Sequence, residues 1–426
     1  MRRLWPALLL VLSLRAVGEE LWEPFVLRAF DGREAAGETR MIAVRENRRA
    51  ADSRWIRIAV VRLRGTGKTP TIFLSGGPGI PATALARVPV YFDLFERLRT
   101  VGDVLLVDQR GSGMSVPNLT CPAEEIANDT FSSDERMRQA LLRRVTRCAK
   151  LWRASGLDLS GYSTAEIAAD VDAVRRAAGA RKVNLLAFSY GSEVAFEIVR
   201  RWPASVQRIV FASTRAPGTL LKSPRVWDQQ LDAIGVKDDV EKIVARLDRE
   251  PIHLGSLTVG GIGLLTLLRG DLPEGRAIPN IPAFVKAVDS GDFSVLEKRL
   301  HQVLDSLGKS FNLMTLAVDC KSGWTPVRLD DTRREAASAV MRNVNLQWDP
   351  EICAALGGAG RPPAIGKITV PSLFITGTLD PNAPIAQTDR IRRHFTKSRH
   401  LIIEKGAHET LPAADVQNEV VRFLRD

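Results

Sequence analysis

The sequence predicts an α/β fold with a mostly parallel central sheet that helices flank on both faces. Three short apolar segments, 71–74, 104–107 and 183–188, alternate with segments of helical periodicity and end in turn-forming residues. Uninterrupted apolar strands separated by helices are typical of parallel sheets that are buried on both faces. This alternation stops after residue 216 and resumes near 366, which indicates a helical insertion in one α/β core.

The composition suits a large globular chain. With 426 residues, of which 45% are hydrophobic and 26% charged, the chain can bury a substantial core. The net charge is +11, but the basic residues are spread along the chain and do not cluster with aromatic residues. This distribution argues against nucleic acid as a partner.

The first 18 residues are typical of an export signal. A basic start at 1–3 precedes an apolar run at 4–14, and Ala16 and Gly18 are the small residues that a signal peptidase requires. The run is too short for a membrane span of about 20 residues. We therefore expect cleavage before Glu19, an exported, periplasmic or extracellular chain, and no stable membrane insertion. An uncleaved anchor is the alternative.

The chain then opens on three expected strands, at 22–30, 39–45 and 55–63. The stretch from Gly65 to Thr69 resembles a phosphate loop only superficially, because Arg62 stands where the first glycine would lie and a strand follows instead of a helix. A metal-ligand spacing and a dinucleotide fingerprint are also missing from the sequence. We expect neither a cofactor nor a bound metal.

A glycine-rich loop follows the strand at 71–74. Its sequence is Ser75-Gly76-Gly77-Pro78-Gly79, and three glycines after a strand allow backbone N–H groups to approach a ligand closely. A flexible turn without a binding role is the alternative. The strand at 104–107 likewise ends in a polar, glycine-containing turn, Asp108 to Gly113, with the sequence DQRGSG.

The apolar strand at 183–188 ends abruptly at Ser189, and a helix is expected at 193–202. Strand, sharp turn and helix with serine at the apex form a nucleophile elbow, G-x-S-x-G, in which Ala187 takes the first glycine's place. The alternative is a serine that only caps the helix. Ser189 is therefore a candidate nucleophile.

The remaining elements divide the chain into a core and a cap. An excursion at 116–161 carries a charged helix at 134–155, and the core resumes with two strands and two helices near the C-terminus: 372–376, 386–395, 401–403 and 416–424. We expect 19–215 and 366–426 to form the core, with 216–365 as a helical cap inserted after the sixth strand. Such a cap would act as a lid over a site.

The chain has four cysteines, all beyond the predicted signal. An even number in an exported chain favours disulfides. Three pairings are possible, and we favour the most local one, Cys121–Cys148 and Cys320–Cys353.

A serine nucleophile needs a base and an acid that orients the base. Of five histidines, only His408 lies in a loop just beyond a predicted strand and before the last helix. Asp380 follows the preceding strand, between turn-forming residues. Ser189, Asp380 and His408 thus occur in the order that an α/β-hydrolase fold requires. A surface residue or a helix cap is the alternative for a single loop Asp or His.

At these residues the sequence resembles the exported branch of the α/β-hydrolase aminopeptidases, which includes proline iminopeptidases and tripeptidyl-aminopeptidase-like enzymes. The motifs that carry the resemblance are GGPG at 76–79, DQRGSG at 108–113, SYG at 189–191, the turn at 377–381 and GAH at 406–408. The resemblance extends from about Leu63 to the C-terminus and is weak across the insertion.

The resemblance implies roles for individual residues. It makes Ser189 the nucleophile, His408 the base and Asp380 the orienting acid, and it places the oxyanion hole at the backbone amides of Tyr190 and Gly76. The DQR turn would support the glycine loop. Three residues differ from many relatives: Ser75, Ala187 and Glu193. Cap carboxylates would bind the substrate's amino group, and the candidates are Glu274, Asp289, Asp292 and Asp319.

These expectations lead to a serine hydrolase that removes N-terminal residues, proline or short peptides, from small peptide substrates through an acyl-enzyme. A carboxylic-ester hydrolase is an alternative, because the same triad serves either chemistry. A hydrolase fold that only binds a ligand is an alternative from another class.

Overall fold

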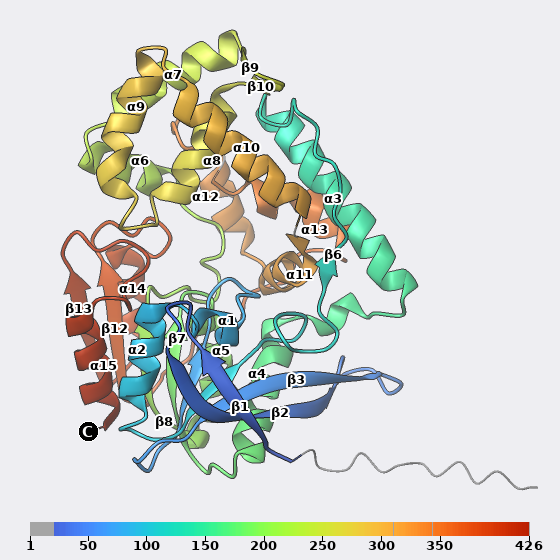
Figure 1. Ribbon diagram of the computed structural model, residues 1–426, viewed down its shortest axis with the longest axis vertical. Coiled ribbons are helices and arrows are strands. Elements are labelled where there is room, and N and C mark those ends of the chain that lie inside the picture. The colour runs from blue at the N-terminus through green and yellow to red at the C-terminus, as the bar shows by residue number, and fades with distance from the viewer. Residues whose placement is uncertain (1–20, 310, 343, 426) are drawn as a thin grey trace, which may run out of the picture.

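The computed structural model describes residues 21–309, 311–342 and 344–425. The predicted signal segment therefore lies outside the described residues. The core is a nine-stranded sheet, which Figure 1 shows at the base of the molecule. Its strands, in spatial order, are β1 (Glu23–Arg28), β2 (Glu34–Arg45), β3 (Trp55–Leu63), β5 (Val104–Val107), β4 (Thr71–Leu74), β7 (Val183–Phe188), β8 (Val206–Ala212), β12 (Ser372–Gly377) and β13 (Ser398–Ile403).

The sheet is parallel from β5 to β13 and antiparallel at the other edge. Strands β1, β2 and β3 pair antiparallel with one another, and β3 pairs antiparallel with β5. The parallel strands β4, β5, β7 and β12 are buried at every residue, as their mostly apolar sequences predict. The predicted mostly parallel sheet is confirmed.

Helices cover both faces of the sheet because alternate strand residues point to opposite sides. In β7, Leu185 faces a core cluster that includes residues of α4 (Thr164–Ala177) and α5 (Gly191–Arg201). Leu186 faces the other cluster, with residues of α2 (Pro89–Leu98) and α15 (Ala414–Arg425). Two shorter helices complete the core, α1 (Ala82–Leu85) and α14 (Ile385–Arg392).

The insertion leaves the sheet after β8 and returns at β12. It lies above the sheet in Figure 1 and has its own apolar cluster, which includes Trp227, Leu264 and Phe284. Strand β8 is the seventh strand of this sheet in chain order, so the insertion follows the seventh strand and not the sixth as predicted. The helices of the insertion are α6 (Pro224–Ala233), α7 (Lys237–Arg249), α8 (Gly261–Asp271), α9 (Ile281–Asp289), α10 (Ser294–Lys309), α11 (Leu313–Ser322), α12 (Pro326–Ala336) and α13 (Pro350–Ala355).

The insertion also contains a short hairpin, β9 (Ile252–Leu254) with β10 (Leu257–Val259). The excursion before α4 packs against this insertion, although the sequence division assigns it to the core range. Phe131 and Met137 join the cap's apolar cluster, and β6 (Thr120–Cys121) pairs with β11 (Phe311–Asn312). Figure 1 accordingly shows α3 (Asp134–Ala154) beside the cap helices.

Two disulfides connect elements of the cap and the excursion. Cys121–Cys148 joins β6 to α3, with Cα atoms 5.8 Å apart, and Cys320–Cys353 joins α11 to α13, with Cα atoms 5.4 Å apart. Among the described helices, none combines the length and apolar character needed to cross a membrane.

Candidate active site

Ser189 stands at a strained turn between β7 and α5. Its φ is 51°, a left-handed backbone conformation that non-glycine residues adopt at a cost of about 1–3 kcal/mol. Gly191 makes the turn possible, because a Cβ there would lie 2.0 Å from the backbone oxygen of Leu74. The close approach of β4 therefore requires glycine at the second glycine position of the elbow motif. The turn exposes the serine at the carboxyl end of β7.

The structure brings Ser189, His408 and Asp380 together in one hydrogen-bonded chain. The Ser189 Oγ lies 2.9 Å from Nε2 of His408, and Nδ1 of His408 lies 3.0 and 2.9 Å from the two carboxylate oxygens of Asp380. Each residue follows a different strand of the sheet: β7, β13 and β12. This arrangement allows His408 to accept the serine proton while Asp380 holds the ring.

Asp380 is buried, with 3% of its surface exposed, yet it stays ionised. Burial raises the pKa of its carboxyl, but the charge and hydrogen bond of His408 and two backbone amides outweigh this effect, so the pKa is lowered overall. The amides of Asn382 and Ala383 donate at 2.9 and 3.0 Å. An ionised Asp380 keeps the proton of neutral His408 on Nδ1 and leaves Nε2 as the acceptor.

The amides of Gly76 and Tyr190 lie beside the serine. A Cβ on Gly76 would lie 3.3 Å from the Ser189 Cβ, and Tyr190 is the N-cap residue of α5. Among the described residues, neither amide has an assigned hydrogen-bond partner. Two free amides beside a serine at a helix N-terminus suit the stabilisation of a developing oxyanion.

The DQR turn supports the glycine loop directly. The Gln109 side chain donates to the backbone oxygen of Ser75 at 3.2 Å and accepts from the amide of Gly79 at 3.1 Å. Asp108 accepts from the backbone and hydroxyl of Thr83, and Arg110 forms a buried ion pair with Asp170 of α4. These contacts keep Gly76 in place beside Ser189.

Ser189 and His408 open into a cavity of about 320 Å³ between the core and the cap. The cap contributes apolar side chains, Trp227 and Val344 among them, and charged ones. The charged side chains of the lining are Arg215, Lys222, Arg269, Glu274 and Glu409. A cavity with a nucleophile and both apolar and charged walls fits a small polar substrate.

Comparison with known proteins agrees with this fold. A family model described as alpha/beta hydrolase fold matches residues 70–239, and a second, described as TAP-like protein, matches residues 339–426. The chain has the α/β-hydrolase fold. The resemblance to the aminopeptidase branch is supported by the TAP-like match and by the relatives below.

Two curated relatives and one solved structure illustrate the similarity. Tripeptidyl aminopeptidase from Streptomyces coelicolor is 24% identical over 409 residues, which cover 83% of this chain and 73% of that protein. Putative hydrolase YuaR from Escherichia coli is 29% identical over 159 residues, 37% of this chain and 30% of that protein. An esterase from Exiguobacterium antarcticum overlaps 91% of this chain and 99% of its own, with a TM-score of 0.43 and 14% identity.

Glu193, one of the three departures from the aminopeptidase resemblance, belongs to a buried ionic network in this hydrolase. Its carboxylate lies 2.7 Å from Nε of Arg215, and Asp319 lies 2.6 Å from another nitrogen of the same guanidinium. Asp319 also accepts from the Trp348 indole at 2.9 Å. Arg215 reaches the glycine loop at the Gly77 oxygen, so Glu193 compensates a cation that links the elbow helix to the cap.

Of the four candidate carboxylates in the cap of this hydrolase, only Glu274 lines the cavity of Ser189. Asp319 is committed to Arg215, whereas Asp289 pairs with Arg246 at the surface and Asp292 caps its own turn. The cavity has a further carboxylate that the motif analysis missed, Glu409. Its only signal in the sequence is that it directly follows the candidate base.

Glu274 and Glu409 influence each other at the mouth of the cavity. The pKa of the Glu409 carboxyl is raised, mainly by burial and then by the negative charge of Glu274. The electrostatic effects of Arg276 and His408 oppose this rise without cancelling it. The Arg276 side chain, 88% exposed, lies 3.8 Å from Glu274. Two carboxylates with so little compensation attract a cation.

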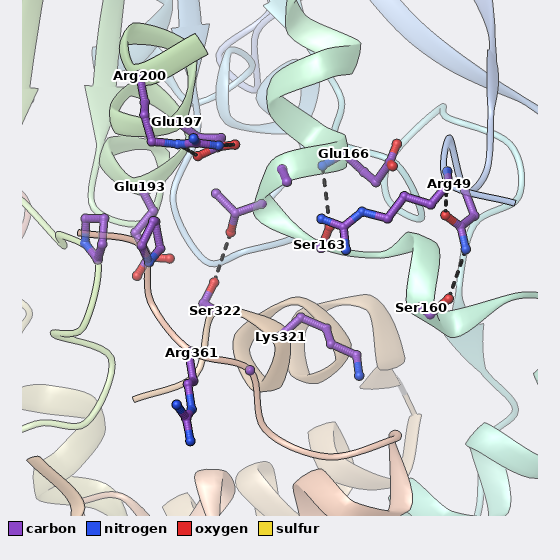
Figure 2. A pocket seen from close by; sticks show the side chains of 16 residues that line it. Arg49, Ser160, Ser163, Glu166, Glu193, Glu197, Arg200, Lys321, Ser322 and Arg361 are labelled. Atoms are coloured by element: carbon purple, nitrogen blue, oxygen red, sulfur yellow. Dashed lines mark hydrogen bonds and ion pairs between the residues drawn. The ribbon is translucent and has the colours of Figure 1, made fainter. Parts of the chain in front are cut away.

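A second cavity of about 430 Å³ lies beside the N-terminus of α4 and does not include Ser189. Figure 2 shows Arg49, Lys321 and Arg361 around it, together with Ser163 and Ser322. Glu193 lines this cavity whereas Arg215 lines that of Ser189, so their ion pair separates the two. Within the described parts of the hydrolase, no group of three or more His, Cys, Asp or Glu is arranged to hold a metal.

Proposed function

We propose that this hydrolase is an exported serine aminopeptidase that acts on short peptides. The observation that carries the proposal is the hydrogen-bonded chain Ser189–His408–Asp380, which opens into a cavity that also holds two weakly compensated carboxylates. The two disulfides support an oxidising, exported environment.

The first half of the proposed reaction forms an acyl-enzyme. His408 takes the proton of the Ser189 hydroxyl as Oγ attacks the substrate carbonyl carbon. The negative charge that develops on the carbonyl oxygen is held by the amides of Gly76 and Tyr190, each worth about 10²–10³ in rate. The C–N bond then breaks, and His408 returns the proton to the leaving amine.

Water completes the cycle. It attacks the acyl carbon while His408 accepts its proton, and the Ser189 Oγ leaves and is reprotonated. The ionised Asp380 stabilises the imidazolium in both halves and is not itself protonated. The groups that act are thus all supplied by this chain and by water.

Exopeptidase action needs a site for the substrate's α-ammonium group. Glu274 and Glu409 supply two carboxylates in the same cavity as Ser189, and the exposed Arg276 lies 3.8 Å from Glu274. An ammonium bound between them would leave the N-terminal part of a peptide beside the nucleophile. The cap closes the cavity above it and favours short substrates.

The test compares three substrates on one protein: a tripeptide anilide with a free amine, its N-acetylated form, and a simple nitrophenyl ester. We expect N-acetylation to lower kcat/KM by about 10- to 100-fold, the range for a charged hydrogen bond. Glu274→Gln and Glu409→Gln should each reduce the ratio of kcat/KM for the free-amine substrate to kcat/KM for its N-acetylated form. Asp292→Asn, which changes an exposed cap carboxylate outside the cavity, should leave this ratio unchanged.

Two results would redirect the proposal. If N-acetylation leaves the rate unchanged and the ester is turned over fastest, the protein is a carboxylic-ester hydrolase and the aminopeptidase assignment is wrong. If a fluorophosphonate probe does not label Ser189 in the folded protein, the fold serves binding and not catalysis.

A further inference from the structure

Lys222 is a buried cation that lines the cavity of Ser189. Only 7% of its surface is exposed, and the chain places it in the segment that leads from β8 into α6. Its ammonium donates to the backbone oxygen of Asn382 at 3.1 Å and that of Thr219 at 3.5 Å. Within the described part of the chain, no carboxylate lies within ion-pair distance of its ammonium.

Arg269 is a second cation of this cavity, and it is half-buried. It lies in the last turn of α8 and lines the same cavity, and its guanidinium donates to the side-chain oxygen of Gln347. Burial lowers its pKa to about 10, so it remains charged at neutral pH. Among the described residues it too has no acidic partner.

Arg215, the third cation of the cavity, differs from Lys222 and Arg269 because carboxylates compensate its charge. Arg215 is held by two buried carboxylates, Glu193 and Asp319, at 2.7 and 2.6 Å. Buried charges in proteins are normally paired, because desolvation of an unpaired ion is costly. Lys222 and Arg269 donate only to neutral oxygens, so the positive charge of Arg269, and that of Lys222 when it is protonated, is left for a ligand in the cavity.

We infer that Lys222 and Arg269 form a subsite that binds a carboxylate of the substrate. The inference rests on the proposed function for the identity of the substrate, a short peptide whose ammonium lies at Glu274 and Glu409. One cavity would then bind both charged ends of a small zwitterion. The carboxylate is supplied either by a free C-terminus or by an acidic side chain.

Matched peptides distinguish these sources. The first pair is Ala-Ala-Ala-Ala with a free carboxylate and the same peptide as a C-terminal amide. The second is an amidated tetrapeptide with Glu at each position in turn and its Gln counterpart. We expect the wild type to cleave the preferred carboxylate form with kcat/KM about 10-fold or more above its neutral partner, mainly through KM.

Variants assign the preference to the two cations. Arg269→Met and Lys222→Met should bring the ratio of kcat/KM for the carboxylate peptide to kcat/KM for its neutral partner close to one. Arg269→Lys should keep part of the preference for the carboxylate peptide. Arg361→Met, which removes a cation from the second cavity, controls for a change in overall charge. Lys222 also supports the loop of Asp380 through Asn382, so Arg269→Met and Arg269→Lys decide the matter if Lys222→Met does not fold.

A binding readout separates this inference from the proposed function. Glutarate should slow fluorophosphonate labelling of Ser189 in the wild type more than glutaramide does, and Arg269→Met should abolish the difference. If the peptides are not cleaved but this difference is found, the peptidase proposal fails and the subsite stands. Equal cleavage of both members of every pair, equal protection by the two probes, or variants that lower all rates without changing the ratio would overturn the subsite.

Discussion

Glu193 and Arg215 form a buried ion pair, 2.7 Å from carboxylate oxygen to guanidinium Nε, between the cavity of Ser189 and the larger cavity beside α4. Both side chains are 4% exposed, and Arg215 also lies over the Tyr190 ring. The pair therefore joins the helix that follows the nucleophile to the cap residue Asp319. Loss of either partner leaves a buried charge with less compensation.

We predict that Glu193→Ala lowers the free energy of unfolding by about 3 kcal/mol. This is the lower end of the range for removal of one partner from a buried ion pair, because Asp319 still compensates Arg215. Urea denaturation measures this change. Glu197→Ala, one turn further along α5, is the matched control: its partner Arg200 is 53% exposed and can be hydrated, so we expect a loss of about 1 kcal/mol or less. Equal losses would contradict a structural role of the Glu193 pair.

The lowered pKa of Asp380 predicts a pH dependence of stability. A carboxyl whose folded-state pKa lies below its unfolded value stabilises the fold above the unfolded value, about 4, and this contribution is lost as the pH falls through the folded value. Asp380→Asn removes this term, so the melting temperature should fall less steeply on acidification below pH 4 than in the wild type. The same variant should lower kcat about 10⁴-fold at pH 7.

Lys222 predicts a second pH effect, on KM. Burial, and after it the positive charge of Arg215, lower the pKa of its ammonium to about 7, against the opposing charges of Asp380, Glu193 and Asp319. The positive charge is therefore present below pH 7 and lost as the pH rises, so KM for a carboxylate-bearing peptide should rise between pH 6 and 8. The matched amide should show no such rise, and neither peptide should show it with Lys222→Met. An identical rise for both peptides would assign the effect to another group.

The Cys320–Cys353 disulfide is expected to affect catalysis as well as stability. It fixes α11, whose Thr315 hydroxyl donates to the oxygen of Pro78 in the glycine loop at 2.9 Å. Replacement of both cysteines by serine should cost about 2–4 kcal/mol of stability and lower kcat more than KM changes. Replacement of Cys121 and Cys148 should cost similar stability with a smaller change in kcat, because that bridge joins β6 to α3.

The order of core elements could be predicted because each depends on a local pattern. The uninterrupted apolar strands β4, β5 and β7, the glycine loop and the elbow at Ser189 all follow from residues that are close in sequence. The position of Asp380 and His408 in loops after successive strands, and their order in the chain, then connected them with Ser189, and the structure places the three within hydrogen-bond distance.

The cap contacts could not be predicted in this way. Arg215 meets Asp319 across 104 residues, and no periodicity in either segment indicates that encounter. The excursion at 116–161 joins the cap because Phe131 and Met137 complete an apolar cluster formed mostly by distant helices. Lys222 and Glu409 became visible as cavity residues only once the folded cap surrounded them.

The most direct test of the central claim is the intact mass of the protein after treatment with a fluorophosphonate. We predict one adduct on the wild type, none on Ser189→Ala, and one on Ser192→Ala. Ser192 is a fitting control because it is buried three residues further on and its hydroxyl has no hydrogen-bond partner in the described structure. An adduct on Ser189→Ala, or a folded wild type that remains unlabelled, would contradict Ser189 as an activated nucleophile.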